Sequence, residues 1–328
     1  MNIDMIRAAA ERAAGHVRRT PLLSSPFLDE IAGRRVLVKA ECLQVTGSFK
    51  YRGGRAAVSA LVAEGETTGV IAYSSGNHAQ GVAMAAREFG LPAVIVMPSD
   101  APAVKIANTR ALGAEVVPYD RGTESREEIG ERLMKERGLS LIRPYDEPMV
   151  IAGQGTCGLE IAEQAAEAGA TQADVLVCCG GGGLTSGIAL ALAAKAPGLR
   201  VRPVEPQAFD DVTRSLASGR REENAETSGG LLDAILTPSP GELTFPILKA
   251  HCGPGLTVTD DEALRAMAVG FERLRVVAEP GGAAALAAAL FQPGNVEGDT
   301  VIAVITGGNV DRPVFDRALA TMEKRQDL

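Results

Sequence analysis

Short apolar runs alternate along the chain with longer segments in which apolar residues recur at helical spacing. The short runs lack a polar residue at every second position, which is typical of strands buried on both faces. The longer segments predict amphipathic helices. We expect strands over residues 36–40, 70–73, 93–97, 115–117, 175–179, 201–204, 256–258 and 301–305. The clearest helices are expected over residues 77–89, 124–137, 185–196 and 260–274.

The order of these elements predicts an α/β fold. Strands that alternate with helices form βαβ units, in which the strands pair in parallel. A chain of 328 residues is long enough for about two domains. Residues 144–148 (PYDEP) are expected to cross between them, and the irregular stretch 218–243 predicts a long surface excursion.

Composition narrows the function classes. The chain has 33 basic and 41 acidic residues, a net charge of −8, and no Lys/Arg cluster, which argues against nucleic-acid binding. It also lacks the run of about 20 apolar residues that a membrane-spanning helix needs. Five irregularly spaced cysteines form no CxxC pair, and the first residues lack the apolar core of a signal peptide. We therefore expect a cytoplasmic protein that acts on a small molecule.

Four consecutive glycines, residues 180–183, follow the predicted strand VLVCC and precede a predicted helix. Backbone N–H groups at such a junction meet the positive end of the helix dipole, and the missing side chains allow a phosphate to approach. The spacing departs from GxGxxG, and no Gly-Lys pair of a P-loop occurs. Glu205, 22 residues after Gly183, leaves a dinucleotide-dependent oxidoreductase as a second hypothesis.

Two more loops follow predicted strands. Residues 74–78 (SSGNH) offer hydroxyls, an amide and free N–H groups that fit a carboxylate, although Ser and Asn at such a place can also simply cap a helix. The overlapping stretch 72–76 (AYSSG) approximates the GxSxG elbow of serine hydrolases, with Ala72 in place of the first glycine. His251 is the candidate histidine partner for such a site. Thr306, after the last predicted strand, lies where ligands bind in open α/β sheets.

Lys50 lies between two aromatic residues, Phe49 and Tyr51, just past a predicted strand. Burial and the nearby charge of Arg52 would disfavour its charged form and leave a nucleophilic amine. A phosphate cradle together with a desolvated lysine is what pyridoxal phosphate requires.

The chain resembles the fold-type II pyridoxal phosphate enzymes, specifically the threonine/serine dehydratase and serine racemase group. The shared motifs, in order along the chain, are RTPLL (19–23), KAECLQVTGSFKYRG (39–53), SSGNHAQG (74–81), IAGQGT (151–156), CGGGGL (179–184), VEP (204–206), EPGGAAAL (279–286) and TGGNVD (306–311). The resemblance implies two open, mostly parallel sheets with flanking helices. It also implies a large cofactor-binding domain (1–58 and 147–328), a small substrate-side domain (59–146) and a homodimer.

The same resemblance implies a role for each site residue. Lys50 would form the Schiff base with pyridoxal phosphate, and Ser75 would stand on the opposite face. The other cofactor contacts would be Phe49, Asn77, Gly180, Gly181, Gly182, Gly183 and Thr306, with Asn77 at the ring oxygen and Thr306 at the pyridine nitrogen. The substrate carboxylate would meet Ser74, Ser75, Asn77 and His78. Mg²⁺ or Ca²⁺ would be held by Glu205, Asp211 and the carbonyl of Phe209, although the two carboxylates also fit an ordinary loop beside a helix start.

The implied reaction is dehydration of L-threonine, L-serine or a similar β-hydroxy-α-amino acid to a 2-oxo acid and ammonia. Serine racemisation is an alternative, with Ser75 as the second proton-transfer group. A 3-hydroxyaspartate dehydratase is another, and it needs a further cation that the sequence does not identify. One departure from the group is Asp233-Ala234, where an Asp-Gly pair is usual, so the path of that loop stays open.

Overall fold

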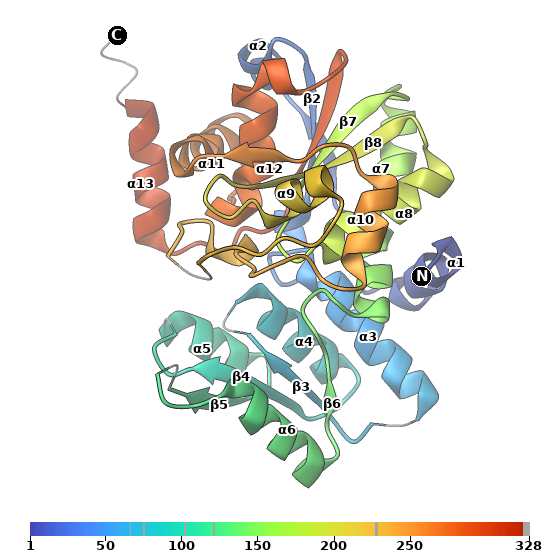
Figure 1. The fold of residues 1–328 in the computed structure, drawn as a ribbon, viewed down its shortest axis with the longest axis vertical. Helices are drawn as coiled ribbons and strands as arrows, with labels where there is room; N and C mark the ends of the chain where they lie inside the picture. The colour runs from blue at the N-terminus through green and yellow to red at the C-terminus, as the bar shows by residue number, and fades with distance from the viewer. Residues whose placement is uncertain (66, 75, 102, 121, 227–228, 324–328) are drawn as a thin grey trace.

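Two β-sheets, each flanked by helices, form the two lobes of the computed structural model in Figure 1. The structure describes residues 1–65, 67–74, 76–101, 103–120, 122–226 and 229–323. The six-stranded sheet has the order β1-β2-β10-β7-β8-β9, and the four-stranded sheet has the order β5-β4-β3-β6. The strands are β1 (Leu22–Ser24), β2 (Arg35–Ala40), β3 (Val70–Tyr73), β4 (Ala93–Pro98), β5 (Glu115–Tyr119), β6 (Ser140–Leu141), β7 (Ala173–Cys178), β8 (Leu199–Pro206), β9 (Leu256–Val258) and β10 (Thr300–Ile305).

Helices connect most of these strands. The α-helices are α1 (Ile3–Ala13), α2 (Pro26–Ala32), α3 (Lys50–Glu64), α4 (Asn77–Glu88), α5 (Ala103–Ala111), α6 (Arg126–Arg137), α7 (Pro148–Glu167), α8 (Gly183–Lys195), α9 (Asp211–Ser218), α10 (Thr244–His251), α11 (Asp260–Leu274), α12 (Pro280–Phe291) and α13 (Arg312–Glu323). Three short 3₁₀ segments are η1 (Glu41–Leu43), η2 (Asp233–Ile235) and η3 (Pro293–Asn295). Among the described helices, none is long and apolar enough to cross a membrane.

Strand β10 shows why the apolar runs do not alternate with polar residues. Its residues Val301, Ala303 and Ile305 pack into a core with α11 and α12, whereas Ile302 and Val304 pack into a second core with α7 and α8. Helices therefore cover both faces of the strand, and every position from Val301 to Ile305 is apolar. The predicted fold class is confirmed: the only antiparallel pair among the described strands is β1 with β2.

The four-stranded sheet repeats this arrangement. Ala72 and Ile95 pack against α3 and α4, while Ile71 and Val96 face Leu133 of α6 on the other side. All eight predicted strands occur, and the sequence missed the short strands β1 and β6. The predicted domain limits stay a prediction, and the limit at residue 58 falls inside the continuous helix α3.

Candidate active site

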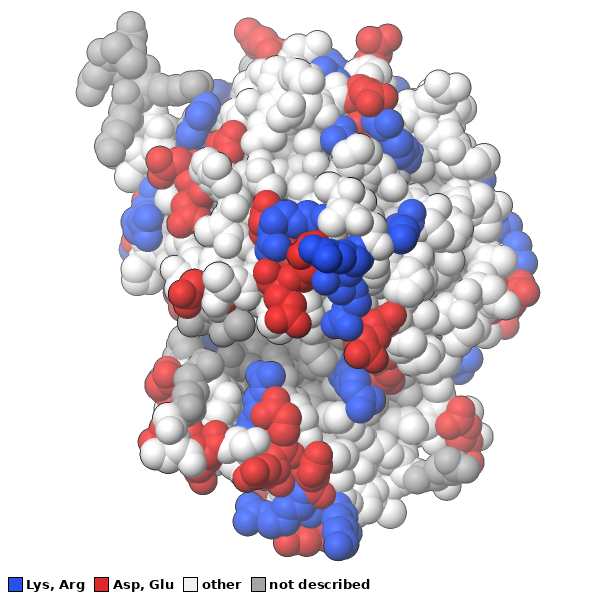
Figure 2. Space-filling model, viewed as in Figure 1, with Lys and Arg blue, Asp and Glu red and all other residues white. Residues whose placement is uncertain are grey.

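A cavity of about 860 Å³ lies between the two lobes. Figure 2 shows the molecular surface hollowed there, with acidic and basic side chains around the hollow. The loops that follow β7 and β10 reach this cavity from the six-stranded sheet, and the loop that follows β3 reaches it from the four-stranded sheet. The carboxyl ends of parallel strands lie at one edge of each sheet, which is where ligands bind in open α/β folds. The structure thus brings together the predicted residues Phe49, Lys50, Ser74, Asn77, His78, Gly180, Gly181, Gly182, Gly183 and Thr306. Ser75 lies outside the described residues.

Lys50 is the first residue of α3, and its amine lies inside the cavity. Nζ donates to the carbonyl oxygen of Pro144 at 2.7 Å and lies 5.1 Å from the centre of the Phe49 ring. Burial lowers the pKa of this amine to about 8, and the nearby Glu279 partly opposes that shift. The amine therefore loses its proton and becomes nucleophilic at a lower pH than an exposed lysine does.

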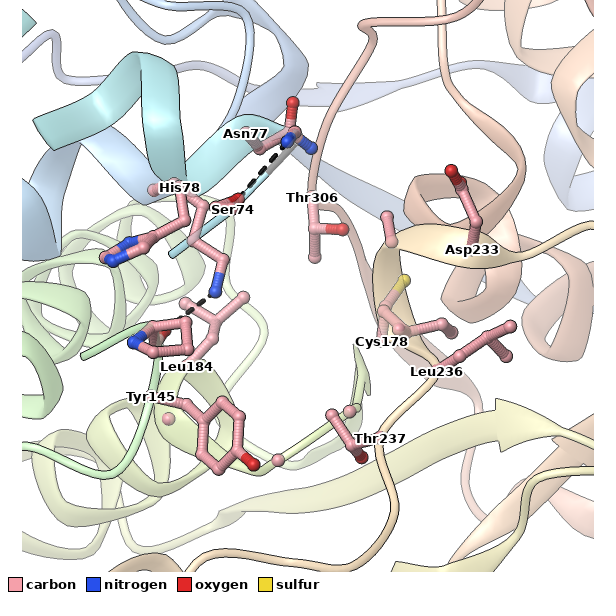
Figure 3. Close-up of a pocket in the computed structure, with 18 of the residues that line it drawn as sticks. Ser74, Asn77, His78, Tyr145, Cys178, Leu184, Asp233, Leu236, Thr237 and Thr306 are labelled. Atoms are coloured by element: carbon pink, nitrogen blue, oxygen red, sulfur yellow. Dashed lines mark hydrogen bonds between the residues drawn. The ribbon is translucent and has the colours of Figure 1, made fainter. Parts of the chain in front are cut away.

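The segment before Lys50 is anchored to the loop after β10. The N–H of Phe49 donates to the carbonyl oxygen of Thr306 at 3.0 Å, and the N–H of Gly308 donates to the carbonyl oxygen of Gly47 at 2.9 Å. Thr306 is nearly buried and lines the cavity. In the view of Figure 3, Asn77 and Thr306 lie above the cavity, and Tyr145 and Thr237 lie below it.

The glycine turn joins β7 to α8. Gly182 has φ +92°, a left-handed conformation that favours glycine, and it precedes the first residue of α8. A Cβ at Gly182 would lie 2.8 Å from Leu248, and one at Gly181 would overlap the ring of Tyr145. Only glycine therefore fits at these positions of the turn. The turn lies at the start of α8, where backbone N–H groups without a partner in the helix favour an anion.

His78 is buried, and its Nε2 lies 2.9 Å from the carbonyl oxygen of Ile142. Burial, with the nearby charge of Lys50, lowers the pKa of the imidazole to about 3, so the ring is neutral at pH 7. If Nε2 donates to the carbonyl, Nδ1 is an acceptor, and it has no partner among the described residues. A neutral ring of this tautomer cannot donate to a carboxylate, so carboxylate binding at this position would use the backbone N–H.

The predicted cation ligands lie away from the cavity lining. Both carboxylate oxygens of Glu205 accept backbone N–H groups at the start of α9, from Val212 at 2.8 Å and Thr213 at 2.6 Å. Asp211 accepts from Asn224 at 2.6 Å through one oxygen, while the other is buried without a partner among the described residues. No cluster of three or more His, Cys, Asp or Glu side chains in the described ranges is arranged to hold a metal. The set with the Phe209 carbonyl stays a prediction.

Several cavity residues had not been predicted. Glu279 accepts a hydrogen bond from Asn77, and Lys105 pairs with Asp233 at 3.6 Å between α5 and η2. Pro144 and Tyr145 belong to PYDEP, for which the sequence predicts only a crossing between the two domains. Glu279 begins the motif EPGGAAAL, so the motif itself was the available signal.

The two-sheet fold, the buried lysine with a lowered pKa and the strand–glycine–helix turn are together the features of an enzyme that binds a phosphorylated aldehyde cofactor. A family model described as "Pyridoxal-phosphate dependent enzyme" matches residues 13–307, and the chain belongs to this family. It is 44% identical over 308 residues to the L-threo-3-hydroxyaspartate ammonia-lyase of a Pseudomonas species, in a match that covers 94% of this chain and 95% of the relative.

Two solved structures match closely. A threonine deaminase from T.th. superposes with a TM-score of 0.89 at 45% identity, and the match covers 95% of this chain and 99% of that one. Maize serine racemase superposes with a TM-score of 0.89 at 36% identity, and the match covers 100% of this chain and 99% of that one. The predicted family and its cofactor, pyridoxal phosphate, are confirmed.

The residues present fit this cofactor. Lys50 offers an amine for the aldehyde of the cofactor, and the turn at 180–183 offers N–H groups for its phosphate. The space beside this turn is open because the four residues are glycines, and side chains at these positions would fill it. The dinucleotide hypothesis assigned the ribose contact to Glu205, which is fully buried and does not line the cavity. The hydrolase hypothesis used His251, an exposed residue of α10 that is also absent from the cavity lining.

Proposed function

We propose that this chain is an ammonia-lyase that removes water from a β-hydroxy-α-amino acid such as L-threonine or L-serine. The products are a 2-oxo acid and ammonia. The observation that supports this most is the Lys50 amine, whose pKa is lowered to about 8 inside the cavity that also holds the turn at 180–183. The 39% identity to the L-threonine ammonia-lyase of Thermotoga maritima, over 97% of this chain, supports the same activity.

Lys50 is the proposed general base. Its unprotonated amine removes the proton from the substrate Cα, a step that typically contributes about 10²–10⁴-fold to the rate. Pyridoxal phosphate, when bound, supplies an electron sink for the negative charge that develops on Cα. The Cα–H electron pair then expels the β-hydroxyl, which takes up the proton that Lys50 removed and leaves as water. A second water molecule hydrolyses the remaining enamine to the oxo acid and ammonia.

The start of α4 is the proposed carboxylate site. Asn77 is the first residue of this helix, so the N–H groups of its first turn have no partner within the helix. The hydroxyl oxygen of Ser74 accepts the N–H of Gly76 at 3.2 Å, which leaves its hydrogen for a ligand. These donors and the helix dipole orient an anion toward the cavity.

Thr306 is the proposed partner of the cofactor's pyridine nitrogen. Its neutral hydroxyl does not enforce a protonated nitrogen as a carboxylate would. We infer that negative charge on Cα is then short-lived, which favours immediate loss of the β-hydroxyl over slower reactions.

A 3-hydroxyaspartate substrate is the second candidate. Its distal carboxylate needs a cation, and the cavity lining includes Lys105, Arg126 and Arg143 on the side of the four-stranded sheet. The 44% identical Pseudomonas relative carries the name of this activity. Replacing one such cation by Gln should raise KM for 3-hydroxyaspartate by roughly tenfold or more, because a charge-assisted hydrogen bond is lost. KM for serine should stay unchanged.

The test is a panel of L- and D-serine, L- and D-threonine and the 3-hydroxyaspartate stereoisomers, with oxo acid, ammonia and inversion followed together. Wild-type enzyme should release oxo acid and ammonia in equal amounts from at least one β-hydroxy-α-amino acid. Lys50→Ala should abolish this release, whereas Lys195→Ala, an exposed lysine, should not. Inversion without elimination would replace the proposal by racemisation, and turnover by Lys50→Ala would contradict the role of Lys50.

A further inference from the structure

Glu279 is a buried carboxyl group in the cavity lining that takes no part in the proposed reaction. It is the N-cap residue of α12, but its side chain makes no capping hydrogen bond to that helix. Its Oε1 instead accepts a hydrogen bond from Nδ2 of Asn77 at 2.6 Å. The side chain of an N-cap residue usually accepts a hydrogen bond from an N–H group in the first turn of its own helix. The Glu279 side chain instead bonds to a residue that lines the cavity.

The Asn77 amide is held from both ends. Its Oδ1 accepts from Nδ2 of Asn309 at 2.7 Å, and Asn309 also donates to the carbonyl oxygen of Thr46 at 2.9 Å. This chain of contacts fixes which end of the Asn77 amide is the NH₂ group. Because the NH₂ group has two hydrogens and Glu279 takes one, the other is left for a ligand in the cavity.

Two glycines leave room for this chain of contacts. A Cβ at Gly307 would overlap Oε1 of Glu279, and a Cβ at Gly47 would lie 2.5 Å from Oδ1 of Asn309. The backbone also ties Glu279 to the same loop, because its N–H donates to the carbonyl oxygen of Gly307 at 3.0 Å.

Glu279 and Lys50 also influence each other's charge. Burial raises the pKa of Glu279 to about 7; Asp233 acts in the same direction, while Asn77, Lys105 and Lys50 oppose it. Glu279 also contributes to the raised pKa of the Cys42 thiol of η1. In return, Glu279 opposes the burial that lowers the pKa of Lys50. A negative Glu279 therefore favours a proton on the Lys50 nitrogen.

We propose that Glu279 is a positioning residue that acts in two ways. Through Asn77 it presents one amide hydrogen to the ring oxygen of the cofactor, and through its charge it holds a proton on the Lys50 nitrogen while that nitrogen is joined to the cofactor. The inference rests on the proposed function for its relevance to turnover. Its test is spectroscopic and does not depend on which amino acid is the substrate.

The experiment is a pH titration of the visible absorbance of the holoenzyme near about 410–420 nm, which reports the protonated nitrogen of Lys50 joined to the cofactor. The apparent Kd for pyridoxal phosphate is measured in parallel. Glu279→Gln keeps the contact with Asn77 and removes the charge. As the pH rises, the visible band of this variant should disappear at a pH about one unit lower than in wild type. This shift in the pKa of the Lys50 nitrogen corresponds to about 1.4 kcal/mol. The Kd of the variant should change less than about threefold.

Glu279→Asp and Asn309→Ala test the positioning of the Asn77 amide. The shorter Asp side chain keeps a charge and loses the Asn77 contact, and Asn309→Ala frees the Asn77 amide to rotate. Both should leave the titration near wild type and raise Kd roughly tenfold, the loss of about one hydrogen bond. Glu147→Gln is the control, because burial also raises the pKa of Glu147 to about 7 but this residue does not line the cavity.

A Glu279→Gln holoenzyme that titrates like wild type would overturn the electrostatic action. Wild-type Kd in both Glu279→Asp and Asn309→Ala would overturn the positioning action, and Asn309→Ala tests it even if the Glu279 variants fail to fold. An enzyme that shows these spectral effects but eliminates water from no amino acid in the panel would refute the proposed function alone.

Discussion

Arg52 and Glu41 form an ion pair with no exposed side-chain surface: Nε of Arg52 lies 2.7 Å from Oε2 of Glu41. The guanidinium also donates to Glu160 at 2.7 Å, and Arg52 follows the reactive Lys50 by two positions along α3. Burial tends to raise the pKa of Glu41, but the adjacent Arg52 outweighs it and holds that pKa below its usual value. The pair therefore stabilises the fold above the ordinary carboxyl pKa of about 4.3, and this contribution is lost as the pH falls.

Arg52→Leu should lower the free energy of unfolding by about 3–5 kcal/mol at pH 7, because it leaves Glu41 charged and unpaired in the interior. Urea denaturation followed by circular dichroism measures this change. Arg137→Leu, which breaks the exposed pair with Glu115, is the control and should unfold like wild type. Equal effects of the two variants would show that the buried pair has no special role in stability.

The lowered pKa of Lys50 predicts how the apoenzyme takes up its cofactor with pH. Only the unprotonated amine attacks an aldehyde, so the rate should rise with pH up to about 8 and then level off. Stopped-flow absorbance after mixing apoenzyme with pyridoxal phosphate measures this rate. An exposed lysine would give a rate that continues to rise toward its ordinary pKa of about 10.4. Such a profile would contradict the burial of the Lys50 amine.

Gly182→Ala should damage the proposed phosphate site. The new Cβ would lie 2.8 Å from Leu248 in a left-handed backbone conformation. We expect a loss of about 1–3 kcal/mol in the free energy of unfolding and weaker binding of pyridoxal phosphate. Thermal unfolding and equilibrium titration with the cofactor measure the two effects. Gly294→Ala is the matched control, since a Cβ there meets nothing within 4 Å.

The predicted cation site can be tested through stability. Asp211 has one buried carboxylate oxygen without a partner among the described residues, which a cation would supply. If Mg²⁺ or Ca²⁺ binds there, it should stabilise the fold by about 2.7 kcal/mol at a concentration 100 times its Kd. Thermal unfolding with added cation or chelator measures this shift. Asp211→Asn should abolish it, whereas Asp210→Asn, which loses the pair with Arg214, should retain it. No response to either ion would mean that Glu205 and Asp211 serve only to start α9.

The sequence predicted those parts of the molecule that have a local signature. Strands buried on both faces read as unbroken apolar runs, and the strand–glycine–helix junction at 180–183 is recognisable from consecutive residues. Strand β6, with two residues, is too short to form such a pattern. The contacts of Lys50 with Pro144 and of Asn77 with Glu279 join residues 94 and 202 positions apart. No local pattern encodes such pairs, because the packing of the two sheets creates them.

The residues proposed to contact the cofactor in this cavity are spread along the chain from Phe49 to Thr306. The strand that leads to Thr306 lies in the middle of the six-stranded sheet, between β2 and β7. A truncation that removes β10 would therefore both split the sheet and delete one wall of the binding site. We therefore expect a fragment that ends before β10 to lose both its folded structure and its capacity to bind the coenzyme.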